Sequence, residues 1–144
     1  MDYTLKRLVR GNGSTTSTSR IGFFTALTGF LASASKLEDP PKIATIAELV
    51  KKEFHSAEEK GKIDSMIGTT LVCGAVIRSG IISTATEAEI EEITKCLVSC
   101  LAKPSVSSLA YTFLNELVIK VSTMTFKAAN MLLKVRSSFS SALM

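Results

Sequence analysis

Apolar residues recur every three or four positions along almost the whole chain, and no other pattern limits the possible folds as strongly. Ile90, Ile93 and Leu97 show the spacing, with Glu91 and Lys95 between them. Because an α-helix turns once every 3.6 residues, this spacing places the apolar side chains on one face and the charged ones outside it. We therefore predict an all-α fold.

Breaks in this pattern divide the chain into separate helices. Asp39-Pro40-Pro41 and Lys103-Pro104-Ser105 each end one helix and begin another, because proline cannot continue a helix but fits its first turn. Gly11-Asn12-Gly13 predicts a helix end, since glycine and asparagine accept the left-handed backbone of a helix stop. The expected helices cover residues 2–10, about 20–34, 41–54, 56–79, 86–102, 105–121 and, with a weaker pattern, 126–135.

Two residue pairs mark helix starts. Ser56 with Glu59, and Thr86 with Glu89, have the spacing of a capping box, in which each side chain bonds a free backbone N–H of the first turn.

The second expected helix carries a wide apolar face. That face comprises Ile21, Phe23, Phe24, Leu27, Phe30 and Leu31.

The helix starts repeat at a nearly constant distance. Those near Pro41 and Thr86 are about 45 residues apart, and those near Ser56 and Ser105 about 49. HEAT and armadillo helix pairs repeat every 40 to 47 residues or so, roughly the same period. Short loops also make neighbouring helices antiparallel. A plain helical bundle gives similar spacings and stays open, but the fold we predict is a HEAT/armadillo-like α-solenoid fragment of antiparallel helix pairs.

We expect one helical-repeat domain over residues 1–122, followed over 123–144 by an extra helix and a frayed or truncated end. Ile46, Leu71, Leu97, Phe113 and Leu117 should be buried. The last stretch carries much apolar surface for the end of a repeat array, whose terminal units need polar outer faces. We therefore expect an exposed patch near the C-terminus and self-association of the chain. The residues of this patch are Val121, Met124, Phe126, Met131, Leu132 and Leu133.

Composition and residue spacing argue against an enzyme. With 144 residues, 46% of them hydrophobic and 21% charged, the chain suits one globular domain. Three cysteines outside any CxxC pair and one histidine, His55, support neither a zinc site nor a disulfide framework. Asp2, Asp39 and Asp64 are scattered, whereas metal-assisted phosphoryl transfer needs converging carboxylates. We expect no catalysis, no metal, no cofactor and no small-molecule ligand.

The candidate contact site is a basic cluster near the N-terminus. Lys6, Arg7 and Arg10 lie within about one turn of each other on the first expected helix and could meet phosphates or an acidic protein surface. For Arg7 the alternative is a bond to helix-end carbonyls or acids of the same chain. For Arg20, which stands amid apolar residues, we favour that intramolecular interpretation.

The N-terminal third has a specific order of residues. It reads Tyr3-Thr4-Leu5-Lys6-Arg7-Leu8-Val9-Arg10-Gly11 and, after a linker, Ser19-Arg20-Ile21-Gly22-Phe23-Phe24-Thr25-Ala26-Leu27. This order resembles the start of the Myb-binding protein 1A/DNA polymerase V (polymerase phi) family. The positions on the family pattern are Tyr3, Leu5, Arg7, Leu8, Gly11, Arg20, Gly22, Phe23, Ala26, Leu27 and Leu31. A looser likeness extends over about the first 120 residues.

The chain departs from the family in places. Asn12 stands where an apolar residue is usual, and the Ser/Thr run at 14–19 is longer. Family proteins are also many times longer and carry a basic C-terminal tail. The resemblance implies a HEAT/armadillo-like (ARM-type) solenoid, residence in the nucleus and nucleolus, and roles in ribosomal-DNA transcription, ribosome biogenesis and transcription regulation.

Our leading expectation is therefore a non-catalytic scaffold that binds nuclear or nucleolar proteins and, more weakly, rDNA or RNA. A sequence-independent nucleic-acid-binding domain is the first alternative. A small membrane-associated protein is the second, although the apolar run Met66–Ile82 contains Arg78 and falls short of the roughly 20 apolar residues of a span.

Overall fold

The computed structural model describes residues 2–55, 62–123 and 128–143, which form seven α-helices and two short 3₁₀ helices and include no β-strand. The α-helices are α1 (Asp2–Gly11), α2 (Ser17–Ala34), α3 (Ile43–Phe54), α4 (Lys62–Ser79), α5 (Glu87–Ser99), α6 (Pro104–Ser122) and α7 (Ala128–Leu143). The 3₁₀ helices η2 (Ile81–Thr84) and η3 (Cys100–Ala102) follow α4 and α5. The predicted all-α class is confirmed.

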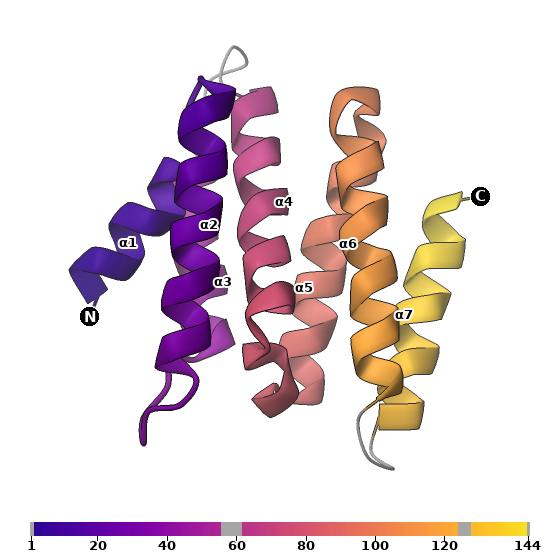
Figure 1. Cartoon of the computed structure of the whole chain (residues 1–144). Coiled ribbons are helices and arrows are strands. Elements are labelled where there is room, and N and C mark those ends of the chain that lie inside the picture. The colour runs from indigo at the N-terminus through magenta and orange to yellow at the C-terminus, as the bar shows by residue number, and fades with distance from the viewer. Residues whose placement is uncertain (1, 56–61, 124–127, 144) are drawn as a thin grey trace.

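The helices lie in two layers (Figure 1). α2, α4 and α6 stand side by side in one layer, and α1, α3, α5 and α7 contact each other in sequence order in the second. Across the layers, α1 packs on α2, α3 on α4 and α5 on α6, and the two helices of each pair run in opposite directions. α4 contacts helices of both layers and so lies at the centre.

α4 is buried around most of its circumference. Every residue from Val72 to Ile77 is buried, and small side chains let the neighbouring helices come close. At Gly74 an added Cβ would lie only 2.2 Å from the ring of Phe113 on α6. A helix that is apolar on all sides belongs in a core or a membrane. Within the described ranges, no helix combines the length and the hydropathy needed to cross a bilayer.

The capping box at the start of α5 is confirmed. The backbone N–H of Glu89 donates to Thr86 Oγ1 at 3.2 Å, and the N–H of Thr86 donates to Glu89 Oε1 at 3.0 Å. The second oxygen of Glu89 accepts the N–H of Ala44, in the first turn of α3, at 2.9 Å. One carboxylate therefore caps two helices. The other predicted capping box, Ser56 with Glu59, lies outside the described residues.

The Gly-Asn-Gly stretch ends α1 as predicted, but the expected left-handed backbone was wrong. In the described part of the chain only Gly80 has a positive φ, of 86°. The two glycines serve close packing instead. A Cβ at Gly11 would lie 2.2 Å from the ring of Phe23, and one at Gly13 would lie 2.5 Å from the ring of Phe54.

Most of the predicted core is buried. Ile46, Leu97, Phe113 and Leu117 are at most 2% exposed. Leu71 is only partly buried, because it packs against the core from its edge.

The placement of Ile21 on the apolar face of its helix was wrong, since this side chain is 66% exposed. α2 turns Leu27, Leu31 and Ala34 fully inward, and Ile21 lies off this line. Phe23, Phe24 and Phe30 are partly buried.

The extra helix that we expected near the C-terminus is present and is longer than predicted. α7 continues to Leu143 and packs on α5 and α6, so most of the stretch that we expected to be frayed is helical. In the predicted C-terminal patch, Val121 is wrong, because it points into the core and is 0% exposed, whereas Leu133 is 64% exposed. The other four residues of the patch have side chains that are not among those that the structure describes: Met124, Phe126, Met131 and Leu132.

Candidate functional site

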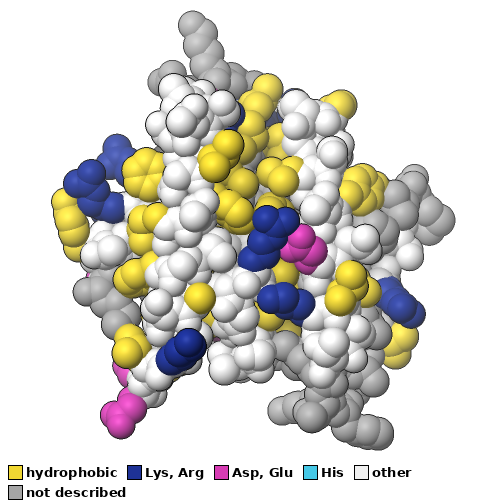
Figure 2. All heavy atoms as spheres, viewed as in Figure 1, with side chains coloured by type: hydrophobic (Ala, Val, Ile, Leu, Met, Phe, Trp, Pro, Cys, Tyr) yellow, Lys and Arg dark blue, Asp and Glu magenta, His cyan; other side chains and the backbone are white. Residues whose placement is uncertain are grey.

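α1 presents a basic outer face because its apolar residues occupy the opposite one. Leu5 and Val9 are at most 2% exposed and belong to the core. Lys6, Arg7 and Arg10 are all exposed. Figure 2 shows basic side chains gathered at the edge of the molecule where α1 lies. The structure thus brings together the three residues that the sequence singled out.

Two of these cations lie near a single carboxylate of α3. Lys6 Nζ is 3.8 Å from Glu53 Oε1, and Arg10 Nε is 3.9 Å from Glu53 Oε2. Glu53 is the shielded partner, with a side chain 13% exposed, while that of Arg10 is 77% exposed. Ion pairs this long and this exposed contribute little to stability. They position the cations without cancelling the charge of the face.

Arg7 is held by an aromatic neighbour instead of an acid. Its Nη1 donates to Tyr3 Oη at 3.1 Å, and its guanidinium lies 5.8 Å from the centroid of the Tyr3 ring. The hydrogen bond to Tyr3 raises the pKa of Arg7 above its already high ordinary value. Neither a helix-end carbonyl nor an acid is the observed partner, so the alternative that we considered for Arg7 is not what the structure shows.

These side chains border an open groove of about 450 Å³ between α1 and the start of α2. Its lining consists of Tyr3, Lys6, Arg7, Arg10, Gly11 and Phe23. Tyr3 is 71% exposed. The groove therefore offers three cations, an exposed aromatic ring and a partly buried one to a ligand.

The sequence analysis missed three residues that lie around these cations. Tyr3 lies four residues before Arg7, on the same face of the helix, and that spacing could have identified it. Phe23 was assigned to the apolar face of its helix. Glu53 comes from α3, and no local pattern connects it with α1.

Arg20 has the structural role that we favoured. Its Nη1 donates to the carbonyl oxygen of Ser14 at 2.7 Å and to Asp64 Oδ1 at 3.2 Å. The side chain of Arg20 is only 18% exposed. It ties the linker before α2 to the first turn of α4, and it is not part of the basic groove.

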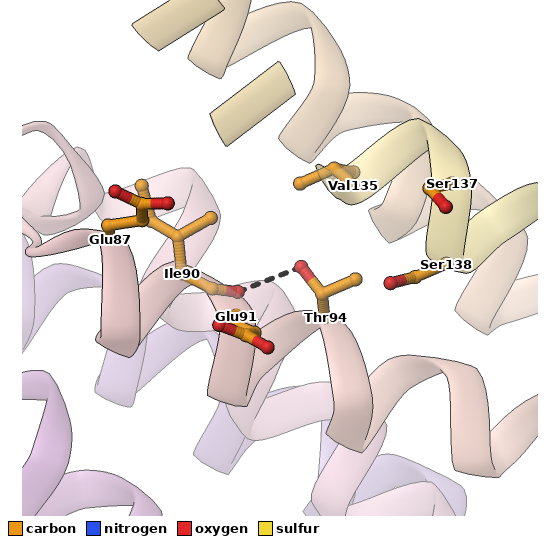
Figure 3. Close-up of a pocket in the computed structure, with 7 residues that line it drawn as sticks. All are labelled: Glu87, Ile90, Glu91, Thr94, Val135, Ser137 and Ser138. Carbon is orange, nitrogen blue, oxygen red and sulfur yellow. Dashed lines mark hydrogen bonds between the residues drawn. The ribbon is translucent and has the colours of Figure 1, made fainter. Parts of the chain in front are cut away.

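A second hollow lies between α5 and α7, with a volume of about 190 Å³ (Figure 3). Ile90 and Val135 are each 1% exposed there, and Glu87 and Glu91 supply carboxylates. The hydroxyl of Thr94 donates to the carbonyl of Ile90 at 2.8 Å, drawn as the dashed line in Figure 3. The hydroxyl of Thr94 thus bonds a carbonyl of its own helix.

The groups that could bind a metal are dispersed. Over the ranges that the structure describes, no three residues among His, Cys, Asp and Glu stand close enough to share an ion. Asp64 is bonded to Arg20, and Cys73, Cys96 and Cys100 are free thiols.

Comparison with known families supports the resemblance seen in the N-terminal residues. A sequence model described as DNA polymerase phi matches residues 3–142, which is nearly the whole chain. Comparison with curated proteins and with solved structures gave no match. The matched segment contains both the basic groove of α1 and the central helix α4. The chain therefore belongs to the DNA polymerase phi family.

Proposed function

We propose that this chain is a non-catalytic helical scaffold, a HEAT/armadillo-like solenoid segment, in a nuclear protein. Family membership points to a nuclear or nucleolar role. Two features support repeat character. Odd-numbered and even-numbered helices occupy separate layers, and the antiparallel pairs follow one another along the chain. Solenoids use such stacked pairs to build extended binding surfaces.

The observation that carries the proposal is the groove beside α1. Lys6, Arg7 and Arg10 are arranged around it with one shielded carboxylate, that of Glu53, on the same side. A surface with this charge attracts a negatively charged partner and speeds its encounter. We assign to it an acidic segment of a nucleolar protein, in a role like that of Myb-binding protein 1A in transcription regulation and ribosome biogenesis.

The absence of catalysis is part of the proposal. Two of the described carboxylates are already engaged in structural contacts. Asp64 bonds Arg20, and Glu89 caps α3 and α5. Nucleotide incorporation above background, abolished by Asp64→Asn, would contradict this part.

Fluorescence anisotropy with a labelled poly-glutamate peptide tests the groove. We expect the variant K6Q/R7Q/R10Q to lose most of the binding. The matched control is K36Q/K42Q/K103Q, which removes the same charge from exposed lysines elsewhere and should bind like the wild type. Equal losses in both variants would show that net charge, and not the groove, attracts the peptide.

Sequence-independent binding of nucleic acid is the second candidate, and the exposed ring of Tyr3 favours it. Single-strand binders combine cations with aromatic rings on which bases stack. Single-stranded RNA should then bind with an affinity that falls with salt, by up to about 0.7 in log K per log salt for each phosphate contact. Tyr3→Ala should weaken RNA binding more than peptide binding. If Tyr3→Ala lowers the affinity for RNA and the affinity for the peptide equally, stacking of bases on Tyr3 plays no part in binding.

A further inference from the structure

Cys73 of α4 and Cys96 of α5 meet at the interface between these helices. Both side chains line one small cavity whose other walls are aliphatic side chains of α3, α4 and α5. Cys73 is buried, at 5% exposure, while Cys96 is partly exposed. The fold therefore pairs a hidden thiol with an accessible one.

Cys96 reaches solvent on its other side. It lines a groove of about 390 Å³ formed by α3, α4 and α5, in which Lys51, His55 and Lys62 also lie. A small reagent that enters this groove meets Cys96 before it can reach Cys73.

The third thiol is poorly placed to react. Cys100 borders the same groove, but it is only 2% exposed. Its Sγ lies 3.7 Å from the carbonyl oxygen of Met66, and burial raises its pKa. Burial makes Cys100, like Cys73, a poor first target for a reagent. Unlike Cys73, it does not line the small cavity that Cys96 borders.

The thiols of Cys73 and Cys96 differ in acidity. The neighbouring Cys73 thiol lowers the pKa of Cys96, although burial and the charge of Glu92 oppose this change, and the ammonium of Lys51 lowers it further. The neighbouring Cys96 thiol and burial raise the pKa of Cys73 well above its ordinary value. Cys96 is thus the more acidic thiol of the pair.

We propose that Cys96 is a site of oxidation by hydroperoxides and that Cys73 converts the product into an intrachain disulfide joining α4 to α5. The accessible thiol, the adjacent hidden thiol and the open groove together define this site.

The chemistry proceeds in two steps. The Cys96 thiolate attacks one oxygen of hydrogen peroxide, an S–O bond forms, the O–O bond breaks, and hydroxide leaves and takes up a proton as water. The sulfur of Cys96, now a sulfenic acid, has lost two electrons to the peroxide. The Cys73 sulfur then attacks it, the S–S bond forms, and the S–O bond breaks. The released hydroxide takes the Cys73 proton, so that two thiols and one peroxide yield one disulfide and two waters.

Peptide mapping of the peroxide-treated 144-residue chain tests the site. Trypsin leaves Cys73 in the peptide 63–78, whereas Cys96 and Cys100 share the peptide that follows Lys95. The variant Cys100→Ser therefore removes the ambiguity. We expect it to lose both remaining thiols, with a mass lower by two hydrogens and a cross-link between the two peptides. A Cys73→Ser chain should instead accumulate sulfenic acid at Cys96, which dimedone captures.

Two results would overturn the proposal. One is a treated wild-type chain in which Cys96 forms a disulfide with Cys100, or with a cysteine of another chain, instead of with Cys73. The other is a Cys100→Ser chain, folded by circular dichroism, in which Cys96 is oxidised no faster than in the same chain unfolded in urea. Brief dimedone labelling of the wild type gives the same information if Cys73→Ser does not fold.

Discussion

The guanidinium of Arg78 holds the carboxylate of Glu116 at two points and thereby joins α4 to α6. Arg78 Nη2 donates to Oε1 at 2.8 Å, and Nε donates to Oε2 at 3.0 Å. The same guanidinium lies 5.6 Å from the ring centroid of Phe24 and 5.0 Å from that of Phe113. One side chain thus connects α2, α4 and α6, the three helices of one layer.

Arg78→Lys should lower the free energy of unfolding although it keeps the charge. Lysine cannot make the two-point contact, and its ammonium lacks a flat face to lie along both rings. Since both partners are partly exposed, with side chains 43% and 30% accessible, we expect a loss of only about 0.5–1 kcal/mol. Urea unfolding checks it. An unchanged midpoint would mean that charge alone accounts for the contact.

Gly74 and Gly22 form a matched pair for testing helix contact. Gly74→Ala should destabilise by about 1–3 kcal/mol, because its Cβ would meet the ring of Phe113 at 2.2 Å. Gly22→Ala adds the same methyl to a helix where nothing lies within 4 Å, and it should stabilise by roughly 0.5–1 kcal/mol. Thermal unfolding of both variants decides the matter. A stabilising Gly74→Ala would show that α4 and α6 are further apart than described.

Truncation of fully buried leucines tests which sides of α5 and α6 point into the core. Leu97 and Leu117 are both 0% exposed, and replacement by alanine should cost about 2–5 kcal/mol at each site. Ile119 is the control, since it is 60% exposed on the same helix as Leu117, and its truncation should change stability by less than about 0.5 kcal/mol. Losses below about 1 kcal/mol at both leucines would contradict the core.

Glu89 should make stability depend on pH. Burial raises the pKa of its carboxyl, but the hydrogen bonds from Thr86, Ala44 and Ile43 outweigh burial and lower it overall. Because the folded pKa is lower than the unfolded value, the stabilisation is present above the unfolded value, about 4.3, and is lost as pH falls through the folded pKa. Glu89→Gln should therefore melt earlier than the wild type at neutral pH. The melting temperatures should converge in acid, and a constant gap would contradict the assignment.

Local signals predicted the parts of the fold that depend on neighbours in sequence. The start of α5 follows from Thr86 and Glu89, and the start of α6 follows from Pro104, whose ring suits a first turn. The basic face of α1 likewise follows from helical spacing. These features depend only on residues that are close together in the sequence.

Long-range contacts could not be predicted in this way. Gly11 and Gly13 look like turn residues in the sequence, yet their role is to admit the rings of Phe23 and Phe54. Asn12 is fully buried, with Nδ2 donating to the carbonyl of Leu8 at 2.8 Å and Oδ1 without a partner in the described structure. The periodic apolar pattern gives no reason to expect a buried asparagine at this position. Each of these outcomes depends on which helix lies opposite, and periodicity does not contain that information.

Nuclear magnetic resonance mapping of the acidic peptide on the labelled chain tests the central claim, that the groove beside α1 is the contact site. We predict shift changes at the amides of Tyr3, Lys6, Arg7 and Arg10, extending to Phe23 across the groove. The amides near Lys103, at the start of α6, should not move. Changes centred on α5 and α7, or spread over every lysine of the chain, would contradict the account.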